Sequence, residues 1–396
     1  VTLGGALIIA AIFEVAGSLI AGGDVVKTVS TGILAPDAVP DAAHFIWAMM
    51  AALLASALWL HVATWMGAPV STTHSIVGGV VGAGVAAAGF GAVNWPAIAT
   101  ISASWVISPI MGGIFAALFL AFIKTKIIYV EDKITAARKW VPMLIGFMSG
   151  TFAAYLALKG LTKILEISLG ASLLIGALVG LVAWGVSVPL VRAQSAGQEN
   201  RKKTLKKLFT IPRIGSAALL SFAHGANDVA NAVGPLAAIV HAVQDGTLSD
   251  KVEVPFWIMA VGAFGISVGL TLFGPRLIKL VGSEITKLNA MRAYCVALSA
   301  AITVIVASWL GLPVSSTHIA VGGVFGVGFY REWHAERRAR RWGLQKGKIV
   351  PPEERARRRL VRRSHITTVV AAWVITVPAS AVLSAGLYWL MNALDG

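Results

Sequence analysis

Charged side chains are scarce in this chain of 396 residues, since only 13% are Asp, Glu, Lys or Arg. Soluble domains carry about 25%. The 57% hydrophobic content and the mean hydropathy of +0.78 exclude a disordered chain. The single cysteine, Cys295, excludes a disulfide scaffold. The composition therefore indicates a polytopic membrane protein.

Long apolar runs fill most of the sequence. They approach the roughly 20 residues that a helix needs to cross about 30 Å of hydrocarbon. We expect membrane segments near 3–21, 45–66, 71–90, 96–122, 141–157, 169–191, 214–243, 255–273, 293–310, 315–330 and 367–390. Segments 71–90 and 315–330 are short and glycine-rich, which favours partial penetration. The predicted fold class is an all-α polytopic membrane protein.

The net charge of +15 comes from two segments. Residues 192–213 hold seven Lys/Arg and one acid, and residues 331–365 hold thirteen Lys/Arg and four acids. Basic loops between apolar spans lie in the cytoplasm according to the positive-inside rule. We expect this orientation in the inner (plasma) membrane of a bacterium or archaeon. A nucleic-acid partner is not expected, because its binding surface would interleave basic and aromatic residues on a folded domain.

A sequence repeat links the two glycine-rich segments. Residues 67–84 recur as residues 311–328, an offset of 244, with twelve of eighteen positions identical. Chance similarity between apolar helices would not keep Pro, Ser, Thr and His in register. The two copies are therefore a true internal repeat.

Loop charges indicate that the repeat is inverted. The loop 22–44 has a net charge of −2 and its counterpart 274–292 has +3, while 85–100 is uncharged and its counterpart 331–365 has +9. Equivalent loops then lie on opposite sides of the membrane, as in many secondary transporters. The Pro-Val-Ser bend of each copy lies either in an interhelix loop or at the tip of a re-entrant hairpin. We favour two re-entrant helical hairpins whose tips meet near the midplane.

The predicted organisation has five parts. Residues 1–191 form the first inverted repeat, N-terminally truncated, and the spans that follow it. Residues 214–330 form the second inverted repeat, and 366–396 the last transmembrane helix. The basic cytoplasmic loops 192–213 and 331–365 separate these parts.

The two hairpin bends supply hydroxyl groups and the opening N–H groups of a helix. Backbone N–H groups at the positive end of a helix dipole form an anion site. Hydroxyl donors without Lys or Arg nearby suit a tetrahedral oxyanion that must also be released. The alternative is that these side chains are simple helix N-caps. The candidates are Ser71, Thr72, Thr73, Ser315, Ser316 and Thr317.

Two carboxylates, Glu14 and Asp228, lie well inside predicted spans. Buried acids in hydrocarbon are costly and indicate function. Asn227, Asp228 and Asn231 offer hard oxygen ligands for sodium, and we expect the two asparagines to share a helix face. The neighbouring residues favour a broken helix that exposes further carbonyls: Gly225, Gly234 and Pro235. A polar clasp between helices is the alternative.

Glu14 is a candidate proton carrier, cation ligand or buried neutral acid packed against a glycine face. His74 and His318 recur in the repeat, and each is either a pH-sensitive group or a structural one. Ser71, His74 and Asp228 suggest a hydrolase triad, but hydroxyls duplicated on both tips argue against a single nucleophile. No zinc spacing, phosphate-binding loop, nucleotide fingerprint or nucleophile elbow occurs in the sequence. We expect no enzymatic activity.

Four motifs together resemble the inorganic phosphate transporter (Pit) family of secondary carriers. They are Gly-Ala-Asn-Asp-Val-Ala-Asn at 225–231, the Pro-Val-Ser-[Ser/Thr]-Thr-His elements at 69–74 and 313–318, and Ile-Phe-Glu at 12–14. The resemblance covers nearly the whole chain. One departure is large, because the family carries its Gly-Ala-Asn-Asp element twice. The repeat offset places the other copy upstream of Val1.

This resemblance implies symport of inorganic phosphate driven by sodium or protons, with no cofactor besides the coupling ion. One phosphate would lie between the two hairpin tips and two broken helices. The six tip hydroxyls, Asn227 and Asp228 would bind phosphate. Asn227, Asp228, Asn231 and Glu14 would serve cation coupling. The expected partners are phosphate, Na⁺ or H⁺ and the lipid bilayer, together with a second copy of the chain in a homodimer.

The expected mechanism is alternating access, in which the repeat-related halves move so that a midplane site faces one side at a time. Two transport alternatives remain open. One is a permease of the same fold for sulfate or another tetrahedral oxyanion, and the other is an anion channel. A non-transporting regulatory protein is a further alternative.

Overall fold

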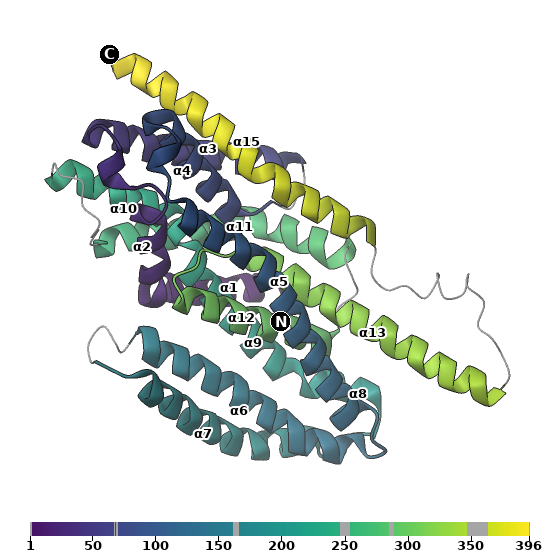
Figure 1. The fold of residues 1–396 in the computed structure, drawn as a ribbon. Coiled ribbons are helices and arrows are strands. Elements are labelled where there is room, and N and C mark those ends of the chain that lie inside the picture. The colour runs from purple at the N-terminus through teal and green to yellow at the C-terminus, as the bar shows by residue number, and fades with distance from the viewer. Residues whose placement is uncertain are drawn as a thin grey trace.

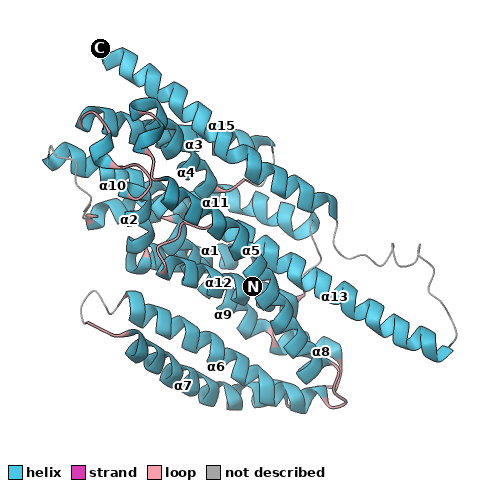
Figure 2. Cartoon of the chain, in the orientation of Figure 1, coloured by secondary structure: helices cyan, strands magenta, loops and turns pink. Residues whose placement is uncertain are grey.

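The computed structural model describes residues 2–66, 68, 70–160, 166–245, 254–284, 289–346 and 363–395. The described residues are helical apart from short connections and one isolated β-bridge between Leu34 and Val93 (Figure 2). This confirms the predicted all-α class. Eight helices in the described part are long and apolar enough to cross a membrane.

The first half of the chain contains five main helices. They are α1 (Leu3–Ala21), α2 (Gly23–Thr31), α3 (Ala42–Met66), α4 (Thr72–Ala88) and α5 (Trp95–Ile123), which ends in the short π-helix η3 (Lys124–Ile128). Helices α3 and α5 are apolar on all faces, as helices surrounded by lipid and protein must be. Asn94 caps α5 by accepting from the N–H of Ala97, and Pro96 fits the first turn because a proline lacks the N–H that would remain unpaired there.

A helical pair separates the two repeats. Helices α6 (Lys133–Lys159) and α7 (Leu169–Ser195) lie side by side along one flank of the molecule (Figure 1). A Cβ added at Gly150 would lie 2.8 Å from the carbonyl oxygen of Gly176, so the two backbones are in close contact. The outer face of α7 exposes large apolar side chains to the membrane: Leu173, Leu174, Leu178, Leu181 and Val182.

The second half follows the short helix α8 (Lys202–Leu208). It contains α9 (Thr210–Asp228), α10 (Ala230–Asp245), α11 (Phe256–Glu284), α12 (Ala290–Trp309), α13 (Ser316–Lys346) and α15 (Arg363–Asp395). The predicted span 214–243 is therefore two helices, interrupted at Val229. The interruption agrees with the predicted broken helix and falls directly after Asp228.

Equivalent pairs of glycines in the two repeats bring a hairpin helix into backbone contact with a neighbouring helix. Added Cβ atoms at Gly322 and Gly326 of α13 would lie 2.1 and 2.0 Å from the carbonyl oxygens of Pro109 and Gly113 on α5. Their repeat equivalents on α4 pack in the same way against α15, with distances of 2.6 Å from Gly78 to Val377 O and 2.1 Å from Gly82 to Ala381 O. Only glycine allows backbones this close. Helices α5 and α15 thus have equivalent places around the two hairpins.

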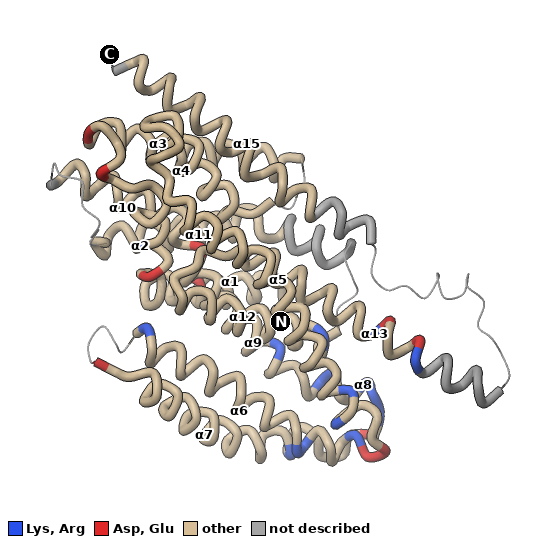
Figure 3. Tube along the Cα trace, in the orientation of Figure 1, with Lys and Arg blue, Asp and Glu red and all other residues tan. Residues whose placement is uncertain are grey.

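Two predicted loops are more helical than expected. The segment 192–213 contains α8 and the end of α7, and α13 continues as one helix from the hairpin through Lys346. The sequence from 331 onward is rich in Arg, Glu and Ala, which are good helix formers, so the helix does not stop at the apolar boundary. Residues 347–362 lie outside the described part. Most described Lys and Arg gather near α8 and the adjoining helix ends (Figure 3).

Candidate phosphate and cation site

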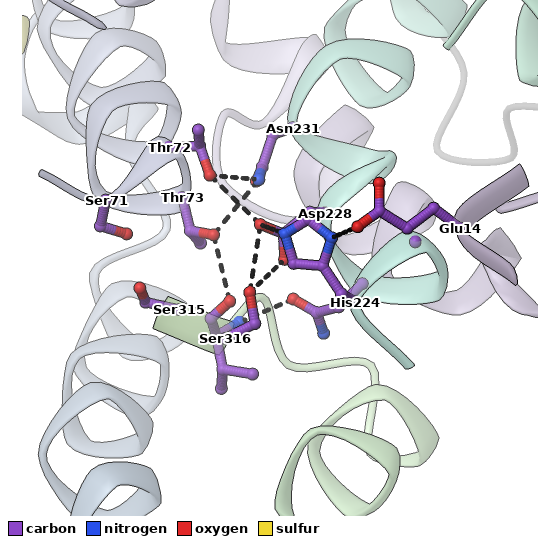
Figure 4. Close-up of polar contacts among 12 residues, drawn as sticks. Glu14, Ser71, Thr72, Thr73, His224, Asp228, Asn231, Ser315 and Ser316 are labelled. Atoms are coloured by element: carbon purple, nitrogen blue, oxygen red, sulfur yellow. Dashed lines mark hydrogen bonds and ion pairs between the residues drawn. The ribbon is translucent and has the colours of Figure 1, made fainter. Parts of the chain in front are cut away.

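The two hairpin bends meet in the interior of the molecule. The first connects α3 to α4 and the second connects α12 to α13. The hydroxyl of Thr73 donates to the carbonyl oxygen of Val314 over 3.1 Å, which joins the first bend directly to the second. Trp105 of α5 also donates its Nε1–H to the carbonyl oxygen of Pro313 over 2.9 Å. The tips therefore meet, as predicted, and polar groups from both repeats face one another (Figure 4).

Asp228 lies at the point where the tips converge. The hydroxyl of Thr72 donates to Asp228 Oδ2 over 3.3 Å, and the hydroxyl of Ser316 lies 3.3 and 3.4 Å from the two carboxylate oxygens. Thr72 and Ser316 are repeat equivalents, 244 residues apart. The side chain of Asp228 is only 11% exposed. One buried carboxylate thus accepts the same interaction from both inverted copies.

Asn231 adds an amide from the first turn of α10. Its Nδ2 donates to the hydroxyl oxygens of Thr72 and Thr73 over 3.2 and 3.3 Å. Its Oδ1 is buried and has no hydrogen-bond partner among the described residues. A buried acceptor without a partner is costly. This oxygen is therefore a candidate ligand for a hard cation such as Na⁺.

Asn227 and Asn231 contact different hairpins, although Val229 between them keeps right-handed helical φ and ψ and donates its N–H to the carbonyl oxygen of Gly225 over 3.3 Å. Its Nδ2 donates to Ser308 Oγ over 2.9 Å and to Leu312 O over 3.1 Å, and its Oδ1 accepts from the N–H of Val314 over 3.1 Å. These contacts use most of the amide's hydrogen-bonding capacity. In this conformation Asn227 is the polar clasp that was the alternative interpretation, and it holds the second hairpin.

His224 bridges the two buried carboxylates. Its Nδ1 lies 3.2 Å from Glu14 Oε1, and its Nε2 lies 3.2 Å from Asp228 Oδ2. Close packing of α1 on α9 places Glu14 there, because a Cβ at Gly225 would lie 2.1 Å from the Glu14 carbonyl oxygen. Glu14 thus both packs against a glycine face and reaches the site.

His224 is not among the site residues predicted from the sequence. The spacing could have indicated it, because His224 lies four positions before Asp228 and residues four apart share a helix face.

Comparison with known proteins assigns the chain. The model of the phosphate transporter family matches residues 1–384. The chain belongs to the phosphate transporter family. The resemblance drawn from the motifs is therefore confirmed, and the protein is an integral membrane transporter rather than an enzyme.

Relatives of this transporter cover nearly its full length. A Helicobacter pylori protein named "Putative phosphate permease" is 45% identical, covering 100% of this chain and 84% of the relative. A Pyrococcus abyssi protein of the same description is 34% identical, covering 98% and 88%. A solved structure described as "The sodium-dependent phosphate transporter" superposes with a TM-score of 0.87 and 32% identity, covering 100% of this chain and 91% of that one.

The other tip hydroxyls of the transporter occupy different places. Ser71 and Ser315 are buried helix caps, accepting from the N–H groups of His74 and His318 over 3.2 and 3.3 Å. For these two serines the N-cap alternative describes the structure. Thr317 is exposed, whereas its repeat equivalent Thr73 is buried against the second bend. The inverted symmetry thus holds for the Ser71–Ser315 pair of caps and for the contacts of Thr72 and Ser316 with Asp228, and it is lost at Thr73 and Thr317.

The two repeat histidines are packed rather than free. The ring of His74 stacks on Trp105 with centroids 3.8 Å apart, and that of His318 stacks on Trp373 at 3.9 Å. Both histidines are buried, and neither ring nitrogen of His318 has a hydrogen-bond partner in the described structure. These contacts favour the structural role over the pH-sensitive one. The two tryptophans were not among the predicted site residues. Each lies one helical turn before the residue whose carbonyl oxygen contacts a hairpin glycine, Pro109 for Trp105 and Val377 for Trp373.

Proposed function

We propose that this phosphate transporter is a cation-coupled symporter that works by alternating access. The observation that carries the proposal is Asp228, which meets the equivalent hydroxyls of Thr72 and Ser316 between two inverted hairpin tips. A buried carboxylate repels a phosphate anion unless a cation lies between them. Binding of the cation and of phosphate is then mutually favourable, and this coupling is what symport needs.

Sodium is the proposed coupling ion. The buried Oδ1 of Asn231, the carboxylate of Asp228 and nearby hydroxyls form an all-oxygen donor set, which suits a hard cation. The similarity to a structure described as sodium-dependent supports this choice. The tip hydroxyls and the first N–H groups of α4 and α13 would hold the phosphate oxygens.

Proton coupling is the second candidate, and one observation favours it. The Glu14–His224–Asp228 contacts form a chain of titratable groups that leads from α1 to the tips. Such chains carry protons in membrane proteins. In this case the same Asp228 would alternate between a protonated and an ionised form during transport.

The test is uptake of labelled phosphate by proteoliposomes under separately imposed sodium and pH gradients. The proposal predicts that a sodium gradient drives accumulation above the external concentration, whereas a pH gradient alone does not. Accumulation driven only by the pH gradient would favour the proton alternative. Flux that never exceeds equilibration would indicate a channel. Competition by sulfate as strong as that by unlabelled phosphate would contradict phosphate selectivity.

We further propose that the basic ends of the helices face the cytoplasm and that the acidic segment around Asp37 faces outside. Single cysteines introduced in a Cys295→Ala background and probed with a membrane-impermeant thiol reagent would test this. Labelling of Asp37→Cys in whole cells, without labelling of a cysteine at Gln198, is the expected result.

A further inference from the structure

An open apolar groove runs along the outside of the hairpin assembly, between α5, α13 and α15. Its volume is about 1190 Å³, above the roughly 300–1,000 Å³ of pockets that hold small molecules. Its wall side chains include the well-exposed Val106, Ile110 and Val374. The groove therefore opens toward the membrane rather than into the phosphate site.

Helix packing explains why the groove exists. Gly113, Gly322 and Gly326 line it, and these glycines let α5 and α13 approach to backbone contact. A floor of glycine has no side chains to fill the space above it, while bulky residues on either side form walls. The inner end is closed by Trp105 and Trp373, which stack on the hairpin histidines.

The other end of the groove is lined by aromatic rings, and cations lie beside these rings. Tyr330 and Trp333 line it there. Lys124 Nζ lies 4.8 Å from the centroid of the Tyr330 ring, and the guanidinium of Arg337 lies 5.2 Å from that of Trp333. Each of these two rings thus carries a cation on its face.

More charge surrounds this pair. Arg292 and Arg331 lie close enough to Lys124 to repel it electrostatically, while Glu332 attracts Arg331. Lys124 is the first residue of η3, directly after the apolar helix α5, and Arg337 lies on the part of α13 beyond the apolar hairpin. The cations therefore lie where lipid headgroups meet water, and basic pockets between membrane helices bind anionic headgroups at that level.

We propose that this groove binds one anionic phospholipid, with its acyl chains along α5, α13 and α15 and its headgroup phosphate between Lys124 and Arg337. An apolar trough that ends in paired cations complements such a lipid at both ends. A neutral hydrocarbon occupant would not explain the cations at one end of the groove. A second copy of the chain would fill the groove without necessarily placing an anion beside them. The site is separate from the Asp228 site and does not depend on the proposed symport.

The experiment uses the full chain in phosphatidylcholine nanodiscs that contain a small fraction of a lipid with a photoactivatable group in one acyl chain. Two probes are compared, phosphatidylglycerol and phosphatidylcholine, and the labelled peptides are identified by mass spectrometry. We expect peptides of α5, α13 and α15 to be labelled about tenfold more by phosphatidylglycerol, the effect of one to two headgroup contacts.

A matched pair of variants tests the role of the cations. Lys124→Gln with Arg337→Gln should remove the preference for phosphatidylglycerol. Lys126→Gln with Lys139→Gln removes two cations that lie 5.8 and 5.3 Å from the Trp140 ring, which is not part of the groove lining, and should leave the preference unchanged. Val374→Trp keeps every cation but fills the groove, and should reduce labelling by both probes.

Equal labelling by the two probes, or a preference that survives Lys124→Gln with Arg337→Gln, would overturn the proposal. Disulfide cross-links between two copies that carry Val374→Cys and Cys295→Ala, with no groove labelling, would also overturn it by showing that a second copy fills the groove. If the double charge variant does not elute as a folded species, the single variants Lys124→Gln and Arg337→Gln test the cations one at a time, and each should reduce the preference for phosphatidylglycerol.

Discussion

The imidazole rings of His74 and His318 meet edge to face, with centroids 4.8 Å apart and an interplanar angle of 62°. These residues are 244 positions apart and occupy the same place in the two repeats. Each is stacked on a tryptophan, which produces a continuous series of four rings beneath the meeting tips. Contact between equivalent residues marks the place where the symmetry axis of the inverted repeats passes through the molecule.

Because His318 makes ring contacts without hydrogen bonds from its ring nitrogens, its role is to fill space between the tips. We predict that His318→Phe keeps at least about half of the phosphate uptake, since volume-conserving changes in packed sites are tolerated best. The shape of the pH dependence should not change. A pH profile displaced by a whole unit in this variant would show that His318 titrates during transport.

Replacing Thr72 tests the hydroxyl that reaches Asp228 from the first hairpin. Thr72→Val keeps the shape and removes the donor, and a hydrogen bond to a charged group contributes about 1.5–3 kcal/mol. The expected loss in uptake efficiency is about ten- to hundredfold. Thr72→Ser keeps the donor and is the control. Similar losses in both variants would mean that the Thr72 methyl group, rather than its hydroxyl, is required.

The buried Oδ1 of Asn231 is predicted to contact the coupling sodium. Asn231→Leu is close in size but offers no ligand, so the sodium concentration for half-maximal uptake should rise about tenfold or more. Phosphate affinity at saturating sodium should change much less. Sodium titrations at fixed phosphate measure this, and an unchanged sodium dependence would remove Asn231 from the cation site.

His224 separates two carboxylates that would otherwise face each other across the α1–α9 contact. We expect His224→Leu to lose most uptake at neutral pH, because Glu14 and Asp228 then lack the group between them. Uptake should recover partly at acidic pH, where protonation of one carboxylate removes their repulsion. Combining His224→Leu with Glu14→Gln should remove the acid requirement, and its persistence would contradict this explanation.

The fold itself is tested at the contact between α1 and α9. Gly225→Ala places a methyl group 2.1 Å from a backbone carbonyl, and overpacking of this kind costs about 1–3 kcal/mol. A lower melting temperature in detergent and weak uptake are expected. Gly269→Ala, where nothing lies within 4 Å of the added carbon, is the matched control and should behave as the unmodified protein.

Much of this architecture could be predicted because the repeat preserves its polar residues. The alignment of 67–84 with 311–328 was enough to predict hairpins, tips that meet and the hydroxyls near the site. Which hydroxyl reaches Asp228 could not be predicted, because capping and substrate binding require the same residue types at the start of a helix. Only the geometry separates Ser71, a cap, from Thr72.

Other features depend on contacts between distant segments. The partners of Asn227 and Asn231 could not be predicted, because the sequence does not show that Asn227 contacts the second hairpin and Asn231 the first. Trp105 and Trp373 were missed since aromatic residues are common in apolar spans, and their stacking on His74 and His318 needs the tertiary arrangement. The segment after residue 330 was predicted to be a loop because of its charge. Its helix-forming residues instead extend α13 to Lys346.

In the proposed symport, Asp228 couples cation movement to phosphate movement. Labelled sodium and labelled phosphate fluxes measured in the same proteoliposomes test this coupling. We expect sodium influx that depends on phosphate in the unmodified protein and in Asp37→Asn, which changes an exposed acid. We expect no such coupled influx in Asp228→Asn. Phosphate-dependent sodium influx that persists in Asp228→Asn would contradict it.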